Sequence, residues 1–207
     1  TGASTFFDQP DPLLFVVRAK YQAEIAELVH YFDTLGLRRL ALVNVNDTFG
    51  KDTEIGFNNA TKKLPADAHS IFTVDRLKPD IAKAAADVGK FAPQAVILAC
   101  PGTTARAMIE ALNKQGTVTQ IAALSNNAGL AFAKSLGALG RGVVVSQVMP
   151  SPVRSTSLLG RELASSAKSA GVAPSYAMTE GYAAARVLVE GLKRAGKSPT
   201  RASFVSG

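Results

Sequence analysis

Few residues in this sequence have side chains suited to catalysis or metal binding, and these residues lie far apart in the sequence. The two histidines are His30, inside a predicted helix, and His69, directly before a predicted strand. Neither has a cysteine or a carboxylate at the spacing of a metal site or of a catalytic triad. We therefore interpret both histidines as surface or packing residues, and we expect no metal site.

Cys100 is the single cysteine, which excludes an internal disulfide and a cysteine-rich metal site. It ends a predicted strand, where a nucleophile can sit. However, Pro101 has no backbone N–H for an oxyanion hole, and no base accompanies the thiol. Asp47 also ends a strand, but turn formation explains a lone Asp there. A buried structural thiol is the favoured interpretation, and an enzyme that uses Cys100 or Asp47 is the weaker alternative.

The sequence contains none of the common catalytic or nucleotide-binding motifs. There is no G-x-S-x-G elbow and no Walker loop, and no G-x-G-x-x-G follows a strand. The net charge of +7 comes from scattered basic pairs and not from one stripe with interleaved aromatic residues. We therefore predict a protein that is not an enzyme, binds no cofactor and binds no nucleic acid.

The hydrophobic pattern alternates between strands and helices over most of the chain. Short, continuous apolar runs indicate strands buried on both faces, and hence a parallel sheet with helices on each side. We expect one doubly wound α/β domain over residues 13–148, after a loop at residues 1–12. The predicted strands are 13–17, 40–45, 70–74, 95–99, 119–124 and 142–148; the predicted helices between them are 21–35, 50–64, 80–91, 103–115 and 128–136.

The alternation stops after a Pro/Ser segment at residues 149–152, which we interpret as a crossover or hinge. Two amphipathic helices are predicted beyond it, at residues 157–170 and 176–195, and a further helix opens at residues 200–204. Their apolar faces have no strand of their own to cover. This part of the chain is expected to pack on a second sheet.

Small and polar residues follow the predicted strands, where an open α/β sheet places its ligands. They are Phe49, the segment 100–103 and the segment 125–127. Hydroxyls and amides there suit hydrogen bonding to a ligand more than chemistry on it, so a binding module is indicated. Two alternatives remain open: Phe49 covers the end of the sheet, and Ser125 to Asn127 cap the next helix.

The order of several short motifs resembles one known family. The motifs are Phe15-Val16-Val17-Arg18 before a helix that begins with Tyr21-Gln22, Asn46-Asp47-x-Phe49-Gly50, Ala92-Pro93-Gln94-Ala95-Val96, Gly142-Val143-Val144 and Gly181-Tyr182-Ala183-Ala184. Together they resemble the type I periplasmic solute-binding proteins of ABC importers, and most of all the leucine/isoleucine/valine-binding and extracellular ligand-binding receptor group.

This resemblance implies two doubly wound lobes that hold a small solute between them in the periplasm and dock on an ABC permease. Residues 13–148 correspond to the second lobe, and residues 1–12 and 149–207 to hinge crossovers and parts of the first lobe. The first strands of that lobe have no counterpart in these 207 residues. The ligand-sensing domain of a regulator or receptor with the same fold is the alternative function.

The resemblance also implies the ligand-binding residues: Gly2 and Ser4 in a carboxylate-binding loop, Phe49, Pro101, Gly102, Ser125 and Asn126 at the strand ends, and Tyr21 and Tyr176 near the cleft. Two positions depart from the amino-acid binders of the family. Ser125 stands where an acid often pairs with the ligand ammonium group, and Phe49 lacks the hydroxyl of a tyrosine. The candidate ligands are amino acids, aromatic or aliphatic carboxylates, and amides. Both departures favour the candidates that carry less positive charge.

Overall fold

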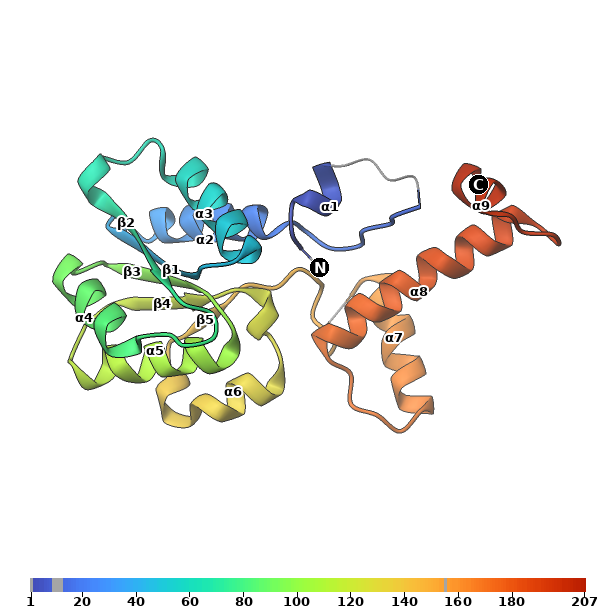
Figure 1. The fold of residues 1–207 in the computed structure, drawn as a ribbon. Helices are drawn as coiled ribbons and strands as arrows, with labels where there is room; N and C mark the ends of the chain where they lie inside the picture. The colour runs from blue at the N-terminus through green and yellow to red at the C-terminus, as the bar shows by residue number, and fades with distance from the viewer. Residues whose placement is uncertain (1, 9–12, 155) are drawn as a thin grey trace. The chain divides into compact units, whose positions relative to one another are not determined.

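The computed structural model describes residues 2–8, 13–154 and 156–207 (Figure 1). The expected loop at residues 9–12 lies outside the described residues. The chain forms two compact units. We call Lys20–Gln147 the sheet unit, and Thr1–Ala19 together with Val148–Gly207 the helical unit.

The sheet unit contains a five-stranded parallel sheet with the strand order β2-β1-β3-β4-β5. Its strands are β1 (Leu40–Val45), β2 (His69–Val74), β3 (Ala95–Ala99), β4 (Gln120–Ala123) and β5 (Val144–Val145). From β1 the chain passes to β2 on one side of the sheet, and from β3 it passes to β4 on the other side. The connections that follow β1 and β3 therefore lead in opposite directions. The predicted doubly wound α/β fold is confirmed, and its switch point lies between the carboxyl ends of β1 and β3.

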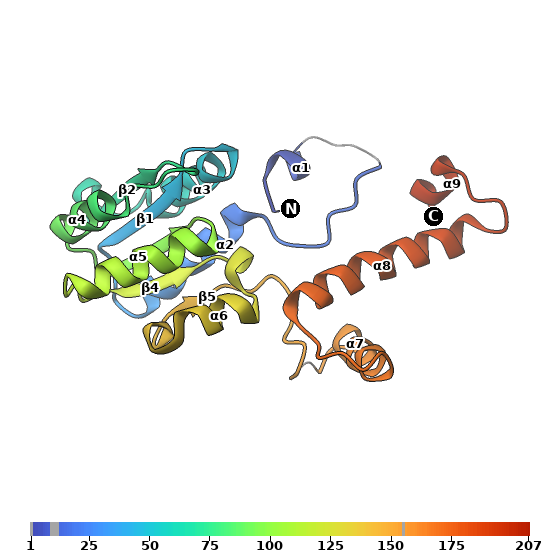
Figure 2. The same cartoon turned by 60° about the horizontal axis from the view of Figure 1, so that its bottom comes forward.

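Helices cover both faces of this sheet (Figures 1 and 2). Helices α2 (Tyr21–Thr34) and α3 (Thr48–Thr61) pack on one face, against the buried side chains of Leu40 and Leu42. Helices α4 (Ile81–Phe91), α5 (Gly102–Lys114) and α6 (Leu130–Leu136) pack on the other, against Ala41 and Val43. Because successive residues of β1 point to opposite faces, its apolar residues from Leu40 to Val43 serve both layers.

Two of the predicted strands differ from the structure: one is absent, and the other is shorter than predicted. Residues 13–17 form no strand, and in the helical unit Leu13 and Phe15 are about half exposed. The strand predicted at 142–148 is only two residues long, because β5 pairs with Ala122 and Ala123 alone. An apolar run indicates that burial of a segment is favourable. A strand also needs a neighbouring strand with which it can form hydrogen bonds.

Short helical turns complete the sheet unit: η1 (Ala66–Ala68), η2 (Ser125–Asn127) and η3 (Gly137–Gly140). In the helical unit, residues 5–8 were expected to be loop, but they form the short helix α1 (Thr5–Asp8). It begins where the backbone carbonyl of Ser4 accepts hydrogen bonds from the N–H groups of Phe7 and Asp8.

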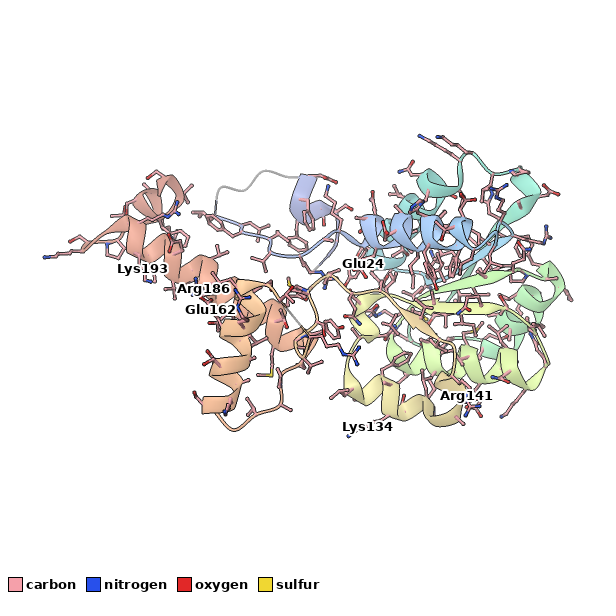
Figure 3. The ribbon with its side chains drawn as sticks, turned by 180° about the vertical axis from the view of Figure 1, so that it is seen from behind. Glu24, Lys134, Arg141, Glu162, Arg186 and Lys193 are labelled. Carbon is pink, nitrogen blue, oxygen red and sulfur yellow. The ribbon has the colours of Figure 1, made fainter. Side chains whose placement is uncertain are left out.

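The predicted carboxyl-terminal helices are present in the helical unit as α7 (Leu158–Ser169), α8 (Tyr176–Ala195) and α9 (Arg201–Ser206). Arg186 on α8 pairs with Glu162 on α7 at 2.9 Å, and both side chains are labelled in Figure 3. A capping box between Thr200 and Ser203 begins α9. No helix in the described part of the chain has both the length and the hydropathy needed to span a bilayer.

Candidate functional site

The carboxyl ends of β1, β3 and β4 form the candidate site of the sheet unit. Because the strands are parallel, the segments after Val45, Ala99 and Ala123 emerge at the same edge of the sheet. Six of the nine sequence-predicted ligand-binding residues lie in the segments that follow these strands or at the start of α2: Tyr21, Phe49, Pro101, Gly102, Ser125 and Asn126.

Asp47, after β1, has a structural role. One carboxylate oxygen accepts the backbone N–H of Gly50 at 2.9 Å and caps α3, and the other pairs with Arg76 at 2.6 Å. Both oxygens therefore have protein partners, as the turn-forming interpretation expects. Within residues 2–8, 13–154 and 156–207, no group of three His, Cys, Asp or Glu side chains is placed to hold a metal ion.

Phe49 lies in the first turn of α3, and its ring meets the ring of Tyr21 edge to face, with centroids 4.7 Å apart and an interplanar angle of 70°. Phe49 is half-buried and packs against the apolar clusters on both faces of the sheet. It therefore covers the end of the sheet, as one of the two alternatives expects. Its position beside Tyr21 also leaves an aromatic pair at the candidate site.

The backbone of this first turn is fixed from inside the sheet. Asn44, a buried residue of β1, donates its side-chain N–H to the carbonyl of Gly50 at 2.9 Å and accepts the hydroxyl of Thr73 at 2.7 Å. A polar residue in the middle of a buried strand is tolerated because both ends of its amide are satisfied. Asn44 thereby couples the start of α3 to β1 and β2.

The thiol at the end of β3 is not available as a nucleophile. Cys100 is fully buried, and burial raises the pKa of its thiol to about 12, so the thiol stays protonated at neutral pH. Its backbone carbonyl accepts the side-chain amides of Asn126 and Asn127 at 3.2 and 3.1 Å. Those two bonds tie the segment after β4 to the end of β3.

Pro101 and Gly102 begin α5, Pro101 as its N-cap residue and Gly102 as its first helical residue. A side chain at Gly102 would stand 3.1 Å from the amide oxygen of Asn127 and 3.4 Å from the ring of Phe132. A groove of about 520 Å³ opens beside this point, between α5 and α6. Gly102, Thr103, Arg106, Asn126 and Phe132 are among its lining residues.

Ser125 to Asn127 form the turn η2 and do not cap the next helix, so that alternative is wrong. The N-cap residue of α6 is Gly129, which makes no side-chain cap. Instead, Ser125 is held by Glu24 of α2, which accepts its backbone N–H at 2.9 Å and its hydroxyl at 2.8 Å.

Sequence reasoning missed Glu24, which is labelled on α2 in Figure 3 and is only 4% exposed. A second hydroxyl, that of Ser146 after β5, donates to the same carboxylate at 2.7 Å. The signal was its spacing: Glu24 precedes Leu28 by one helical turn, on the apolar face that also carries Ile25 and Phe32. A carboxylate on a buried helix face must be met by donors from elsewhere in the fold.

The other three predicted residues lie in the helical unit. Gly2 is buried, and a side chain there would stand 3.1 Å from the guanidinium of Arg18, which pairs with Glu180 of α8 at 3.6 Å. Ser4 is buried at the start of α1. Tyr176 is the first residue of α8, directly after the capping residue Ser175.

Comparisons with known proteins agree with this geometry. A family model described as periplasmic binding protein matches residues 2–207. A comparison with curated protein sequences gave no match. Similar solved structures include a possible leucine/isoleucine/valine-binding protein from Rhodopirellula baltica SH 1, which is 24% identical with a TM-score of 0.88, over 99% of this chain and 57% of that one.

Two further structures are slightly closer in sequence. A substrate-binding periplasmic protein from Ralstonia solanacearum is 28% identical with a TM-score of 0.84, over 100% of this chain and 59% of that one. An extracellular ligand-binding receptor from Verminephrobacter eiseniae ef01-2 is 26% identical with a TM-score of 0.84, over 99% and 60%. The chain thus spans less than two thirds of each of these proteins. The resemblance of the sequence motifs is confirmed: the chain belongs to the family of type I periplasmic binding proteins.

Proposed function

We propose that the protein is the extracytoplasmic solute-binding component of an ABC importer and that it binds a small molecule without transforming it. One observation carries this proposal. The carboxyl edge of the parallel sheet gathers an aromatic pair, a small residue and hydrogen-bonding side chains, in Phe49, Gly102, Ser125 and Asn126, while its one thiol is buried and protonated. Such an edge is suited to ligand recognition, and its buried thiol is not available as a nucleophile.

The mechanism that follows is a population shift. A solute that contacts residues of both units, with Gly2, Ser4 and Tyr176 supplied by the helical unit, binds the closed arrangement more tightly than the open one. Its differential affinity for the two states then drives closure. A membrane permease would recognise the closed form and receive the solute from it.

The candidate ligands are amino acids, including branched-chain ones, aromatic or aliphatic carboxylates, and amides. The edge-to-face pair of Tyr21 and Phe49 supports an apolar or aromatic portion. Gly2 is the proposed contact for a ligand carboxylate, because a glycine leaves its backbone N–H without a side chain in the way.

We propose further that the sheet unit is the second lobe and that the helical unit is part of the first lobe. Helix α8 supports this assignment, because Leu188, Val189 and Leu192 on it are 54%, 46% and 43% exposed. The solved relatives are longer than this chain, which spans 57–60% of them. The remainder of the first lobe would supply the sheet that covers these side chains.

The test is a thermal-shift screen of the full-length protein against amino acids, aromatic and aliphatic carboxylates and amides. We expect at least one solute to raise the melting temperature, because a ligand that binds only the folded state stabilises it. The same solute should lose its effect on the Phe49→Ala variant and keep it on Leu130→Ala, a change at a residue that is 67% exposed. If no solute raises the melting temperature, the proposed function is wrong.

A further inference from the structure

Strand β2 lies at one end of the described sheet, where it pairs with β1 on one side (Figure 1). Along a strand, the N–H and C=O groups of successive residues point alternately to its two sides. The carbonyl of Val74 accepts the backbone N–H of Asn46, which follows β1, at 3.1 Å, so Val74 faces β1. His69, Ile71 and Thr73 therefore turn their N–H and C=O groups to the other side. Within the part of the chain that the structure describes, these outward groups form no hydrogen bond.

The sequence of β2 lacks the features that usually keep an edge strand from pairing. Natural edge strands are often very short, bulged, or interrupted by a proline or a charged side chain. β2 is six residues long, like the interior strand β1, and its register with β1 is continuous from His69 to Val74. Its sequence, HSIFTV, contains neither a charged residue nor a proline. Such an edge is a template for one more strand.

The surface beside this edge is open and carries charges of both signs. A groove of about 360 Å³ follows β2 from Ile71 to Asp75 and is lined on its other side by α4. Its charged lining residues are Lys78 and Lys83, of one sign, and Asp75, Asp80 and Asp87, of the other. A surface on which both signs alternate can be complementary to itself, which is what a two-fold contact between identical chains requires.

Helix α4 shows how the charges would match. Lys83 and Asp87 lie one helical turn apart and pair with each other along α4. A two-fold axis through the edge of the sheet reverses the direction of α4 in the second copy. The Lys83 end of one helix then comes toward the Asp87 end of the other, so opposite charges approach and like charges are kept apart.

The strand also fits its own copy in one preferred register. In an antiparallel pair, residues that face each other with their N–H and C=O groups exchange two hydrogen bonds. If Ile71 lies opposite Ile71 of the second copy, His69 lies opposite Thr73 at both ends, and all the outward groups are paired. A shift by two residues in either direction leaves one of these residues unpaired on each strand.

We propose that β2 is a dimerisation edge, at which the β2 strands of two copies pair antiparallel about a two-fold axis at Ile71. The two sheets then form one continuous sheet. This inference goes beyond solute binding and does not depend on it. The candidate site follows the carboxyl ends of β1, β3 and β4, whereas the dimer uses the side of β2, so each copy keeps its own site accessible.

Disulfide cross-linking tests the register. Opposed residues of a hydrogen-bonded antiparallel pair have Cα atoms about 5.5 Å apart, within the range of a disulfide. In the full-length protein under mild oxidation, Ile71→Cys should therefore form a cross-linked dimer at least about tenfold faster than Leu77→Cys. Leu77 is the matched control because it is 86% exposed but lies outside the paired strand. The native Cys100 is fully buried, so it should not contribute.

Sedimentation velocity of the full-length protein tests the contact itself. We expect a dimer that dissociates on dilution, because paired strands alone make a small interface. Thr73→Lys and Thr73→Val both lose the hydroxyl that bonds Asn44, but only the lysine places a charge on the edge. The dimer Kd should rise at least about tenfold in Thr73→Lys relative to Thr73→Val. Circular dichroism melts show that both variants fold.

Three results would overturn the inference. The first is a full-length protein that stays monomeric up to about 100 µM, where even a weak dimer of this kind is populated. The second is a dimer that Thr73→Lys and Thr73→Val affect equally, which places the contact elsewhere. The third is cross-linking of Leu77→Cys as fast as that of Ile71→Cys. The solute screen is a separate experiment, since a monomer can bind a solute as well as a dimer can.

Discussion

Gly50, in the first turn of α3, lies against the backbone of Val45: a Cβ atom on Gly50 would stand 1.6 Å from the Val45 carbonyl oxygen. No side chain fits there without moving α3 away from the end of β1. We predict that Gly50→Ala lowers the free energy of unfolding by about 3 kcal/mol, as expected for overpacking against a rigid backbone. Urea denaturation measures this change.

Gly129→Ala is the control for that experiment. A Cβ atom at Gly129 would meet nothing within 4 Å, and its φ of −73° suits any residue. Its effect on stability should stay at or below about 1 kcal/mol, the cost of alanine at a helix N-cap. Equal destabilisation by the two substitutions would show that Gly50 does not pack tightly against the backbone of Val45.

Asp75 predicts a dependence of stability on pH. Its carboxylate accepts the backbone N–H groups of Lys78 and Leu77 and the side-chain amide of Asn46, and these bonds lower the pKa of Asp75 below its ordinary value of 3.8. A lowered folded pKa stabilises the folded state above the unfolded pKa, and this contribution is lost as the pH falls through the folded pKa. Unfolding midpoints of the wild type and Asp75→Asn, measured between pH 7 and pH 2, should therefore differ most at neutral pH and converge in acid. Parallel curves across the whole range would contradict this account.

Cys100 should be unreactive in the folded protein. It is fully buried, and its thiol has a pKa of about 12, so neither access nor thiolate is available at neutral pH. We predict that an aromatic disulfide reagent labels Cys100 at least about a thousandfold more slowly in buffer than in denaturant, because labelling must await opening of the core. Rapid labelling of the native protein would restore the enzyme alternative that uses this thiol.

Phe49 should matter to both stability and binding, because its ring packs on both apolar clusters and against Tyr21. Phe49→Leu keeps an apolar residue over the sheet but loses the aromatic pair. We expect it to cost about 1 kcal/mol in stability, and to weaken binding of the stabilising solute by about tenfold. Calorimetric titration gives the binding change. A variant with a lower melting temperature but wild-type affinity would show that Phe49 only covers the sheet.

The central strands could be predicted from the sequence because their apolar composition indicates that they are buried. Apart from Asn44, the runs in β1 and β3 are apolar on both faces, which is typical of interior parallel strands. Residues 13–17 and 142–148 carry similar runs, but whether they form strands depends on a pairing partner that the local sequence does not encode. The strand predicted at 13–17 is therefore absent, and the one predicted at 142–148 is reduced to Val144–Val145.

The residues of the candidate site also fall into two groups, those that local sequence predicts and those that it does not. Phe49, Gly102 and Ser125 were predicted from position, since each follows a strand that composition identifies, and the structure places each of them after its strand. Glu24 was not found, because its role depends on a hydroxyl 101 residues further along the chain. A carboxylate on the apolar face of a helix was the only local sign of it.

The central claim is that the carboxyl edge of the sheet binds the solute. Amide hydrogen exchange on the full-length protein, with and without a stabilising solute, tests this claim most directly. The account predicts that added protection in the sheet unit is concentrated at residues 46–50, 100–103 and 124–127, the segments that follow β1, β3 and β4. Protection confined to the opposite, amino-terminal edge of the sheet, at residues 38–40 and 93–95, would contradict it.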